Sequence, residues 1–344
     1  MTTQMAREIR EQPEAVARTI SGLLPSAGAI RRLVGERRHV LLAGRGTSDN
    51  AAVYGQYVLS ARGRLATLAS PSIATAYHAH LDLSDVVVVG LSQSGTTAEI
   101  VEMLEWAARC GARTIAVTNE AESSLAAVAD LALVTRAGHE IAVPATKTYT
   151  AQLAAMAVLG LVLAEDADML AQLERVPEQM ERALDSGPLM GQLAASLVEV
   201  DRFVIAARGF ASSVARELAL KLQEACYVTA VGLSYADLLH GPIAMVGDGV
   251  PTALIASSGD AATFPGMVEV ARSCARAGSK VIAFGGDTEL AAECEISVAG
   301  PDSDAMLAPM SLVIPGQLLV EALARAKGID PDAPRGLRKV TQTT

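Results

Sequence analysis

Residues 85–97 read DVVVVGLSQSGTT and carry the strongest structural signal in the chain. The apolar run 85–91 has no polar alternation, which is typical of a strand buried on both faces. The amphipathic segment 98–109 that follows is typical of a crossover helix. Similar apolar runs stand at 38–43, 113–118 and 131–135. Short buried strands that alternate with helices predict an α/β fold with parallel sheets.

The second half of the chain repeats the first. FVIAARGFASS at 203–213 is similar to LLAGRGTS at 41–48, and ARAGSKVIAF at 275–284 is similar to ARCGARTIAV at 108–117. TALIASSG at 252–259 takes the place of the LSQSG stretch. Three matches in the same order predict a duplicated α/β domain.

Helices are expected at 1–24, with a break near Pro13, and at 150–164. The pattern divides the chain into an N-terminal helical arm at 1–25, a first domain at 26–165, a helical connector at 166–189, a second domain at 190–330 and a C-terminal tail at 331–344.

Composition excludes several classes of protein. The chain has 344 residues, of which 51% are hydrophobic, so it is long enough for two hydrophobic cores. Its formal net charge is −10 and it has no basic run, so nucleic-acid binding is not expected. The four cysteines, at 110, 226, 274 and 294, lack metal or redox spacing and are expected to be small buried core residues in a reducing compartment.

Neither a signal peptide nor a membrane span is expected. Residues 1–13 are polar and have no apolar core of the signal-peptide kind. The most apolar stretch, 153–164, has 12 residues, which is too short to cross a bilayer. We therefore expect a cytoplasmic protein without a membrane partner.

SQSGTT at 92–97 is the strongest candidate binding site. It follows a strand and opens a helix, where free N–H groups and the helix dipole favour an anion. Gly95 permits close approach of a ligand. A helix cap alone needs one hydroxyl, whereas this loop has four, so the pattern favours a phosphate monoester. The polar side chains are Ser92, Gln93, Ser94, Thr96 and Thr97.

Two other loops of this kind follow strands. GRGTS at 44–48 either adds Thr47 and Ser48 to the same ligand or is only a glycine turn with a helix cap. SSG at 257–259, in the second half, lacks the full set of hydroxyls. Phosphate binding of this type is therefore expected only in the first domain.

Several motifs together resemble the SIS (sugar isomerase) domain family. They are GRGTS, SQSGTT, GHEIAVPATK at 138–147, LLHGPIAM at 238–245 and the ending PRGLRKVT, in that order. The resemblance is to double-SIS phosphosugar enzymes such as the isomerase half of glucosamine-6-phosphate synthase and the free-standing glucosamine-6-phosphate deaminases. It implies two tandem flavodoxin-like, five-stranded αβα sandwiches and a homodimer.

The resemblance also implies catalytic roles. Glu224 would move a proton between C1 and C2 of the sugar, with Lys221 one turn away on the same helix face. His240 would open the sugar ring, contributed across the dimer interface, and Lys339 would form an imine with the keto sugar. Taken alone, these residues also fit a solvated helix position, a turn and a solvated tail charge.

The substrate contacts that the resemblance implies fall on Thr47, Ser48, Ser92, Gln93, Ser94 and Thr97, with further contacts at Gly46, Gly95, Glu140, Lys147 and Lys221. Glu140 and Lys147 either touch the substrate or only close their loop. The synthase has Glu where Thr96 stands here.

The predicted reaction converts glucosamine 6-phosphate to fructose 6-phosphate and ammonia. In the family's synthase a glutaminase cysteine follows the initiator Met, whereas Thr2 follows Met1 here, so glutamine hydrolysis is not expected. One alternative is a fructosamine-6-phosphate deglycase, which uses the same proton transfer. The other is a non-catalytic sugar-phosphate sensor, which would be expected to lack Glu224 or His240.

No cofactor is expected. The five histidines form no ligand cluster with acidic partners, so no metal site is predicted. GRGTS lacks the GxGxxG spacing of a dinucleotide site, and the predicted reaction involves no net oxidation.

Overall fold

The computed structural model describes residues 2–339, which form two compact units. Of the described residues, the first-sheet unit combines Glu14–Glu140, Lys147–Arg175, Arg338 and Lys339. The second-sheet unit combines residues 2–13 with Ile141–Thr146 and Val176–Leu337. The units therefore exchange segments along the chain, whereas the expected division runs in sequence order.

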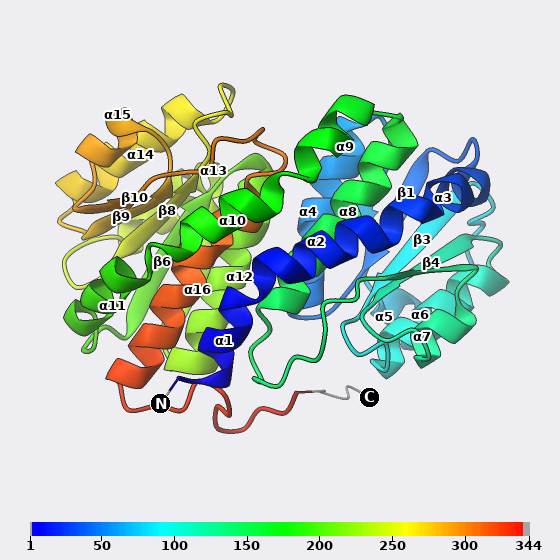
Figure 1. The fold of residues 1–344 in the computed structure, drawn as a ribbon, viewed down its shortest axis with the longest axis horizontal. Helices are drawn as coiled ribbons and strands as arrows, with labels where there is room; N and C mark the ends of the chain where they lie inside the picture. Colours follow the sequence, from blue (N-terminus) through cyan, green and yellow to red (C-terminus); the bar gives the residue numbers. More distant parts are fainter. Residues whose placement is uncertain (1, 340–344) are drawn as a thin grey trace. The chain divides into compact units, whose positions relative to one another are not determined.

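The first-sheet unit contains five parallel strands in the order β2-β1-β3-β4-β5 (Figure 1). The strands are β1 (His39–Ala43), β2 (Leu65–Leu68), β3 (Val86–Leu91), β4 (Arg113–Thr118) and β5 (Leu131–Val134). The helices are α2 (Gln12–Leu23), α3 (Ala27–Val34), α4 (Thr47–Ala61), α5 (Ser72–Thr75), α6 (Ala98–Arg109), α7 (Ser124–Val128), α8 (Lys147–Ala164) and α9 (Ala167–Leu173).

Both faces of this sheet are covered because its central strands are buried at most positions. Successive side chains of a strand point to opposite faces, so Val88 packs with α6 while Val87 and Val89 face the other way. α5, α6 and α7 pack together on one face. α4 and α8 pack on each other at Gly55 and Gly160, where a Cβ would lie 2.6 Å from Met156 Cε and 2.5 Å from Val58 Cγ1 respectively.

The second-sheet unit repeats this arrangement with strand order β10-β9-β8-β6-β7, all parallel. The strands are β6 (Arg202–Ala207), β7 (Thr229–Ser234), β8 (Thr252–Ala256), β9 (Val281–Gly285) and β10 (Ile296–Val298). The helices are α1 (Gln4–Arg10), α10 (Val176–Leu184), α11 (Gly187–Ser196), α12 (Ser212–Cys226), α13 (Tyr235–Leu239), α14 (Phe264–Arg276), α15 (Thr288–Ala292) and α16 (Pro309–Ala326).

Helices also cover both faces of the second sheet. α14 packs with the inner strands in one hydrophobic cluster, and Figure 1 shows α14 and α15 side by side on one face of the sheet. On the other face α16 packs against α1, α10, α11 and α12. The expected α/β fold with two tandem, doubly wound parallel sheets is thereby confirmed.

The N-terminal helix is broken near Pro13 as expected: the break falls at Glu11, and Pro13 lies in the first turn of α2, where its missing N–H costs nothing. The stretch expected as a helical connector contains α9, α10 and the start of α11. The expected start of the apolar helix at 150 needs correction, because α8 begins at Lys147 and has 18 residues.

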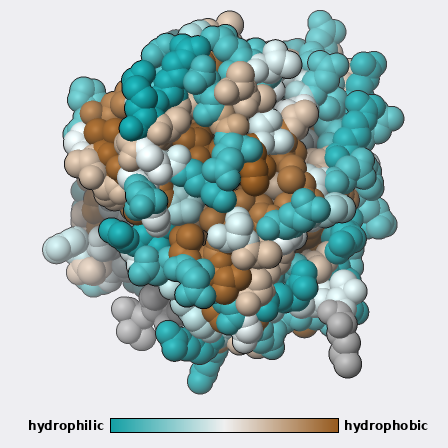
Figure 2. Space-filling view, turned by 90° about the vertical axis from the view of Figure 1, so that its left-hand side faces the viewer, coloured by the Kyte–Doolittle hydropathy of each residue, from teal (hydrophilic) through white to brown (hydrophobic). Residues whose placement is uncertain are grey.

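Helix α8 is, among residues 2–339, the one helix long and apolar enough to cross a membrane. Within that 18-residue window, 89% of the residues are buried inside the structure, as in the core helix of a folded domain. Cys110, Cys226 and Cys274 are buried as expected, whereas Cys294 is half-buried. Figure 2 shows one face of the molecule, on which hydrophobic patches are separated by hydrophilic side chains.

Candidate functional site

The strand order of the first sheet creates a topological switch point at the carboxyl ends of β1 and β3. These neighbouring parallel strands are followed by connections that leave toward opposite faces of the sheet, and ligands of doubly wound folds bind at such switch points. The loop after β1 is GRGTS and the loop after β3 is SQSGTT. The structure thus brings the two loops that the sequence singled out to one edge of the sheet.

Hydrogen bonds between hydroxyls shape the SQSGTT loop. Ser92 Oγ lies 3.0 Å from Thr97 Oγ1 and accepts a bond from the Gly95 N–H at 3.1 Å. Ser94 Oγ lies 2.9 Å from Thr96 Oγ1 and accepts from the Thr96 N–H at 3.2 Å. Thr97 occupies the N-cap position of α6 but makes no side-chain cap bond. The hydroxyls therefore order the loop around the helix start instead of serving only as a cap.

Gly95 is required by both conformation and packing. Its φ of +63° lies in the left-handed region that favours glycine. A Cβ there would lie 2.2 Å from Ser123 Oγ and 2.8 Å from Thr118 Oγ1. The peptide at this position therefore packs tightly against the loop that follows β4.

The GRGTS loop is joined to α6 by an ion pair. The Arg45 guanidinium donates two bonds of 2.6 Å to the Glu99 carboxylate, and this contact raises the pKa of Arg45. Thr47 is half-buried as the first residue of α4, and the buried Ser48 Oγ accepts a 3.0 Å bond from Gln152 on α8. Sequence reasoning did not single out Arg45, because its partner lies 54 positions away.

Asn119 connects the SQSGTT loop to the loop after β5. Its backbone N–H donates to the Gln93 carbonyl at 3.0 Å, and its side-chain NH₂ donates to the Gly138 carbonyl at 3.0 Å. Its amide oxygen accepts from Thr135 and from the Ala137 N–H. Asn119 was not singled out from the sequence, because a lone Asn after a strand is also a common turn residue.

Glu140 stands at the N-terminus of α8 and holds the C-terminal lysine. Its carboxylate accepts bonds from the Thr148 N–H at 3.1 Å and the Thr148 hydroxyl at 2.7 Å. Lys339 Nζ lies 2.6 Å from the same carboxylate and is 24% exposed. Lys147 is buried as the first residue of α8. Glu140 thus both closes its loop and positions the Lys339 amine.

Helix α12, in the second-sheet unit, carries a cluster of three ionised groups. The buried Lys221 ammonium donates to the Glu224 carboxylate and lies 3.4 Å from Glu217 Oε1. Glu217 is fully buried, whereas Glu224 is 23% exposed. The i, i+3 and i, i+4 spacing places the three groups on one helix face. Sequence reasoning missed Glu217, although that spacing gives its signal.

His240 ends α13 and is exposed. Its imidazole has no hydrogen-bond partner among residues 2–339, and the structure gives no contact between it and Glu224. The predicted site residues therefore fall in two groups. The phosphate loops, Glu140, Lys147 and Lys339 belong to the first-sheet unit, and Lys221, Glu224 and His240 belong to the second-sheet unit.

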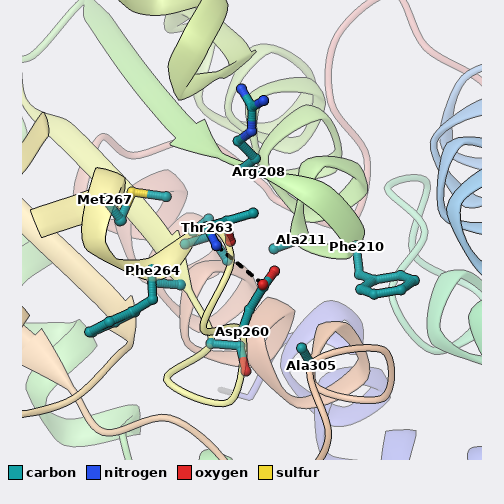
Figure 3. A pocket seen from close by; sticks show the side chains of 11 residues that line it. Arg208, Phe210, Ala211, Asp260, Thr263, Phe264, Met267 and Ala305 are labelled. Carbon is teal, nitrogen blue, oxygen red and sulfur yellow. Dashed lines mark hydrogen bonds between the residues drawn. The ribbon is translucent and has the colours of Figure 1, made fainter. Parts of the chain in front are cut away.

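The equivalent switch point of the second sheet, after β6 and β8, holds a small cavity of about 10 Å³ (Figure 3). Arg208 and Phe210 line it from one side, and Asp260 points into it between Thr263 and Ala305. The Asp260 carboxylate accepts a 3.2 Å bond from the Thr263 N–H. A space of this size holds about one water molecule, and a carboxylate there opposes a phosphate. These observations favour phosphate binding in the first-sheet unit.

Residues 2–339 contain no group of three or more His, Cys, Asp or Glu that could hold a metal ion.

Comparison with known proteins gives a consistent result. The family model of the SIS domain matches residues 33–162. The glutamine–fructose-6-phosphate aminotransferase (isomerizing) of Thermococcus kodakarensis is 35% identical over 97% of this chain. The chain spans 57% of the length of that relative.

Two solved structures match nearly the whole chain. A candidate phosphosugar isomerase from Silicibacter pomeroyi is 33% identical, with a TM-score of 0.85 over 96% of this chain and 100% of the other. The C-terminal domain of glucosamine-fructose-6-phosphate aminotransferase from Francisella tularensis is 27% identical, with a TM-score of 0.90 over 97% of this chain and 99% of the other.

Proposed function

Because the chain belongs to the SIS domain family, we propose that it is a phosphosugar isomerase that acts on an amino-sugar phosphate. The specific reaction is glucosamine 6-phosphate plus water giving fructose 6-phosphate plus ammonia. The names of the relatives support this substrate class, since the Thermococcus kodakarensis protein is an isomerizing fructose-6-phosphate aminotransferase. The reaction proposed for this chain releases the amino nitrogen of the sugar as free ammonia.

The observation that carries the proposal is the charge cluster on α12. A base that moves a proton between neighbouring carbons must reach the substrate and be held in place. Glu224 is partly exposed, and its carboxylate accepts a hydrogen bond from the buried Lys221 ammonium. Glu217 Oε1 lies 3.4 Å from the same Lys221 ammonium, so carboxylates on two sides hold the lysine in position.

The first-sheet unit contains the proposed phosphate ligands. The helices α4 and α6 begin after the neighbouring strands β1 and β3, and the N-terminus of each carries the positive end of a helix dipole. The hydroxyls of the SQSGTT loop are neutral donors, which suits a phosphate monoester. Thr47, Ser48, Ser92, Gln93, Ser94 and Thr97 are the proposed phosphate ligands, with Gly46 and Gly95 presenting their backbones.

The chemistry then assigns one step to each remaining group. His240 transfers the proton that opens the sugar ring. Glu224 removes the proton from C2 and returns it to C1, which converts the 2-amino aldose to a 2-imino ketose. The Lys339 amine adds to C2, ammonia leaves, and water hydrolyses the resulting imine to release fructose 6-phosphate.

Lys339 must leave its ion pair to act as a nucleophile. Glu140 can accept the proton of the ammonium, since the two groups lie 2.6 Å apart. We propose that Glu140, and Lys147 at the start of α8, lie near the substrate.

A homodimer in the cytoplasm, with His240 contributed to the neighbouring subunit, belongs to the same proposal. Exposed Leu239 and Met245 on either side of His240 offer apolar surface to a second copy.

The test is ammonia release from glucosamine 6-phosphate, with fructose 6-phosphate measured by a coupled assay. The wild-type chain should form both in equal amounts. Glu224→Gln should lower turnover at least a thousandfold while sugar-phosphate affinity stays within a fewfold, because the phosphate ligands are unchanged. Glu199→Gln, at an exposed position before β6, serves as the matched control and should keep wild-type turnover.

Other results would replace the proposal. Release of an amine from fructosamine 6-phosphate, without ammonia from glucosamine 6-phosphate, would identify a deglycase. Sugar-phosphate binding without turnover of either compound would identify a sensor.

A further inference from the structure

The second-sheet unit contains a larger cavity that the proposed reaction does not use. Its volume is about 480 Å³, and it opens between α10, the start of α11, the loop after β10 and the first half of α16. Gly285, at the carboxyl end of β9, also lines it. Small-molecule pockets have volumes of roughly 300–1,000 Å³ and occur at this edge of α/β sheets. Neither Glu224 nor His240 lines the cavity.

The floor of the cavity contains polar atoms without partners. Ser311 on α16 is 2% exposed and lines the cavity, yet its hydroxyl has no hydrogen-bond partner among residues 2–339. Pro315, four positions later in the same helix and also in the wall, has no N–H to donate to the Ser311 carbonyl. One hydroxyl and one carbonyl of the same buried residue therefore lack their usual partners, which is unfavourable unless a bound molecule supplies them.

The polarity and charge of the residues that line the cavity indicate what kind of ligand it accepts. Leu189, Val298, Leu312 and Pro315 give the cavity an apolar interior. The charged residues that line it, Arg182, Asp185 and Asp302, are exposed and together carry no net positive charge. An anion such as a sugar phosphate is therefore disfavoured. A neutral molecule can fill the apolar interior and place a hydroxyl against Ser311.

The loop that closes one side of the cavity is fixed in place. Gln179 on α10 donates to the Asp302 carbonyl at 2.7 Å and accepts from the Asp302 N–H at 2.9 Å. This two-bond contact joins α10 to the loop after β10 across the outer wall. The cavity thus has a preformed shape, as ligand pockets usually do.

We propose that this cavity is a second small-molecule site, which takes a neutral, partly apolar ligand whose hydroxyl pairs with Ser311. The hydroxyl of the ligand donates to the Ser311 carbonyl and accepts from the Ser311 side chain. This site is separate from the sugar-phosphate site in residues, in charge and in the kind of molecule it selects.

The test uses cyclohexanol as a probe, which carries one hydroxyl on an apolar ring. Its binding to the full-length chain is measured by saturation-transfer NMR, and we expect a Kd on the order of 1 mM. Ser311→Ala should raise this Kd about tenfold. Ala183→Trp, which fills the cavity from α10, should abolish binding. Both variants should keep the fold, because one removes an unpaired hydroxyl and the other changes a half-buried position.

Ser257→Ala is the matched control, since it removes another buried hydroxyl without a partner in the same unit, outside this cavity. It should leave the Kd unchanged. Glycerol, which has hydroxyls but no apolar body, should bind at least tenfold more weakly than cyclohexanol. The proposal is overturned if wild type does not bind cyclohexanol at 10 times the expected Kd, or if Ser311→Ala and Ala183→Trp bind it like wild type.

Discussion

At the scale of single residues, the substitution of a buried charged group should be costly. Lys221→Met removes an ammonium that lies 3.4 Å from the fully buried Glu217 and also contacts Glu224. Breaking a buried pair on one side leaves an uncompensated charge, so we expect a loss of about 3 kcal/mol in the free energy of unfolding. Urea denaturation measures this loss. The double variant Glu217→Gln/Lys221→Met should recover most of it, and a single variant as stable as wild type would contradict the charge argument.

Gly95 offers a second test at the residue scale, because it combines strain with a steric conflict. Gly63→Ala is the matched control: Gly63 has φ +82° but nothing within 4 Å of a Cβ, so it reports strain alone. We expect about 1 kcal/mol of destabilisation for Gly63→Ala and about 2 kcal/mol more for Gly95→Ala. Urea denaturation measures the free energy of unfolding of both variants, and titration with glucosamine 6-phosphate measures their affinity for the sugar phosphate. Equal losses would mean that the Ser123 contact is unimportant.

The sequence predicts site residues when the signal is local. Ser92 to Thr97 stand in one loop, so their hydroxyls could be recognised together. Arg45 and Asn119 could not be identified in the same way, because their importance comes from partners that are distant in the sequence. Glu217 differs, since its i, i+4 spacing from Lys221 could have been recognised.

At the scale of elements, the ion pair between Arg45 and Glu99 joins the starts of α4 and α6. Arg45→Met would remove this partner and leave the Glu99 carboxylate in the first turn of α6, where it repels a phosphate dianion. We expect the Kd for glucosamine 6-phosphate to rise about tenfold, measured by calorimetry. Arg109→Met, at the other end of α6, is the matched control. Equal affinity in both variants would exclude this role for Arg45.

The difference between predicted and missed strands has a physical cause. The strands β1, β3, β4, β6, β8 and β9 are buried on both faces and therefore read as apolar runs. β2, β7 and β10 lie at sheet edges, where half-exposed positions mix polar and apolar residues. Such edge strands look like loops in a single sequence. β5 is also an edge strand, but Leu131–Val134 is an apolar run, so it could be predicted. Five strands in each sheet were implied only by the resemblance to the SIS domain family.

At the scale of the whole molecule, the buried thiols should make the free energy of unfolding fall at alkaline pH. Burial raises the pKa of Cys226 to about 12 and the pKa values of Cys274 and Cys294 to about 11. Above an unfolded-state pKa of about 8.5, the unfolded chain loses these protons while the folded chain keeps them. Stability should therefore fall as pH rises from about 9 toward 11, by about 1.4 kcal/mol per pH unit for each such thiol.

Urea midpoints at pH 8, 9 and 10 measure this fall. Cys226→Val, a buried apolar replacement on α12, should make the curve shallower. Native thiols should also react slowly with a thiol reagent at pH 8 and completely after unfolding. A flat stability curve in wild type would show that these thiols do not control alkaline stability.

The exchange of segments between the two units affects how the chain is made. The first-sheet unit contains Lys339, which the ribosome adds 199 positions after Glu140. A nascent chain can build β1 to β5 early, yet Glu140 meets its lysine partner only after the whole second sheet has been synthesised. Translation itself therefore delays the proposed chemistry, because a ribosome that stalls before Lys339 leaves a folded first sheet without its amine.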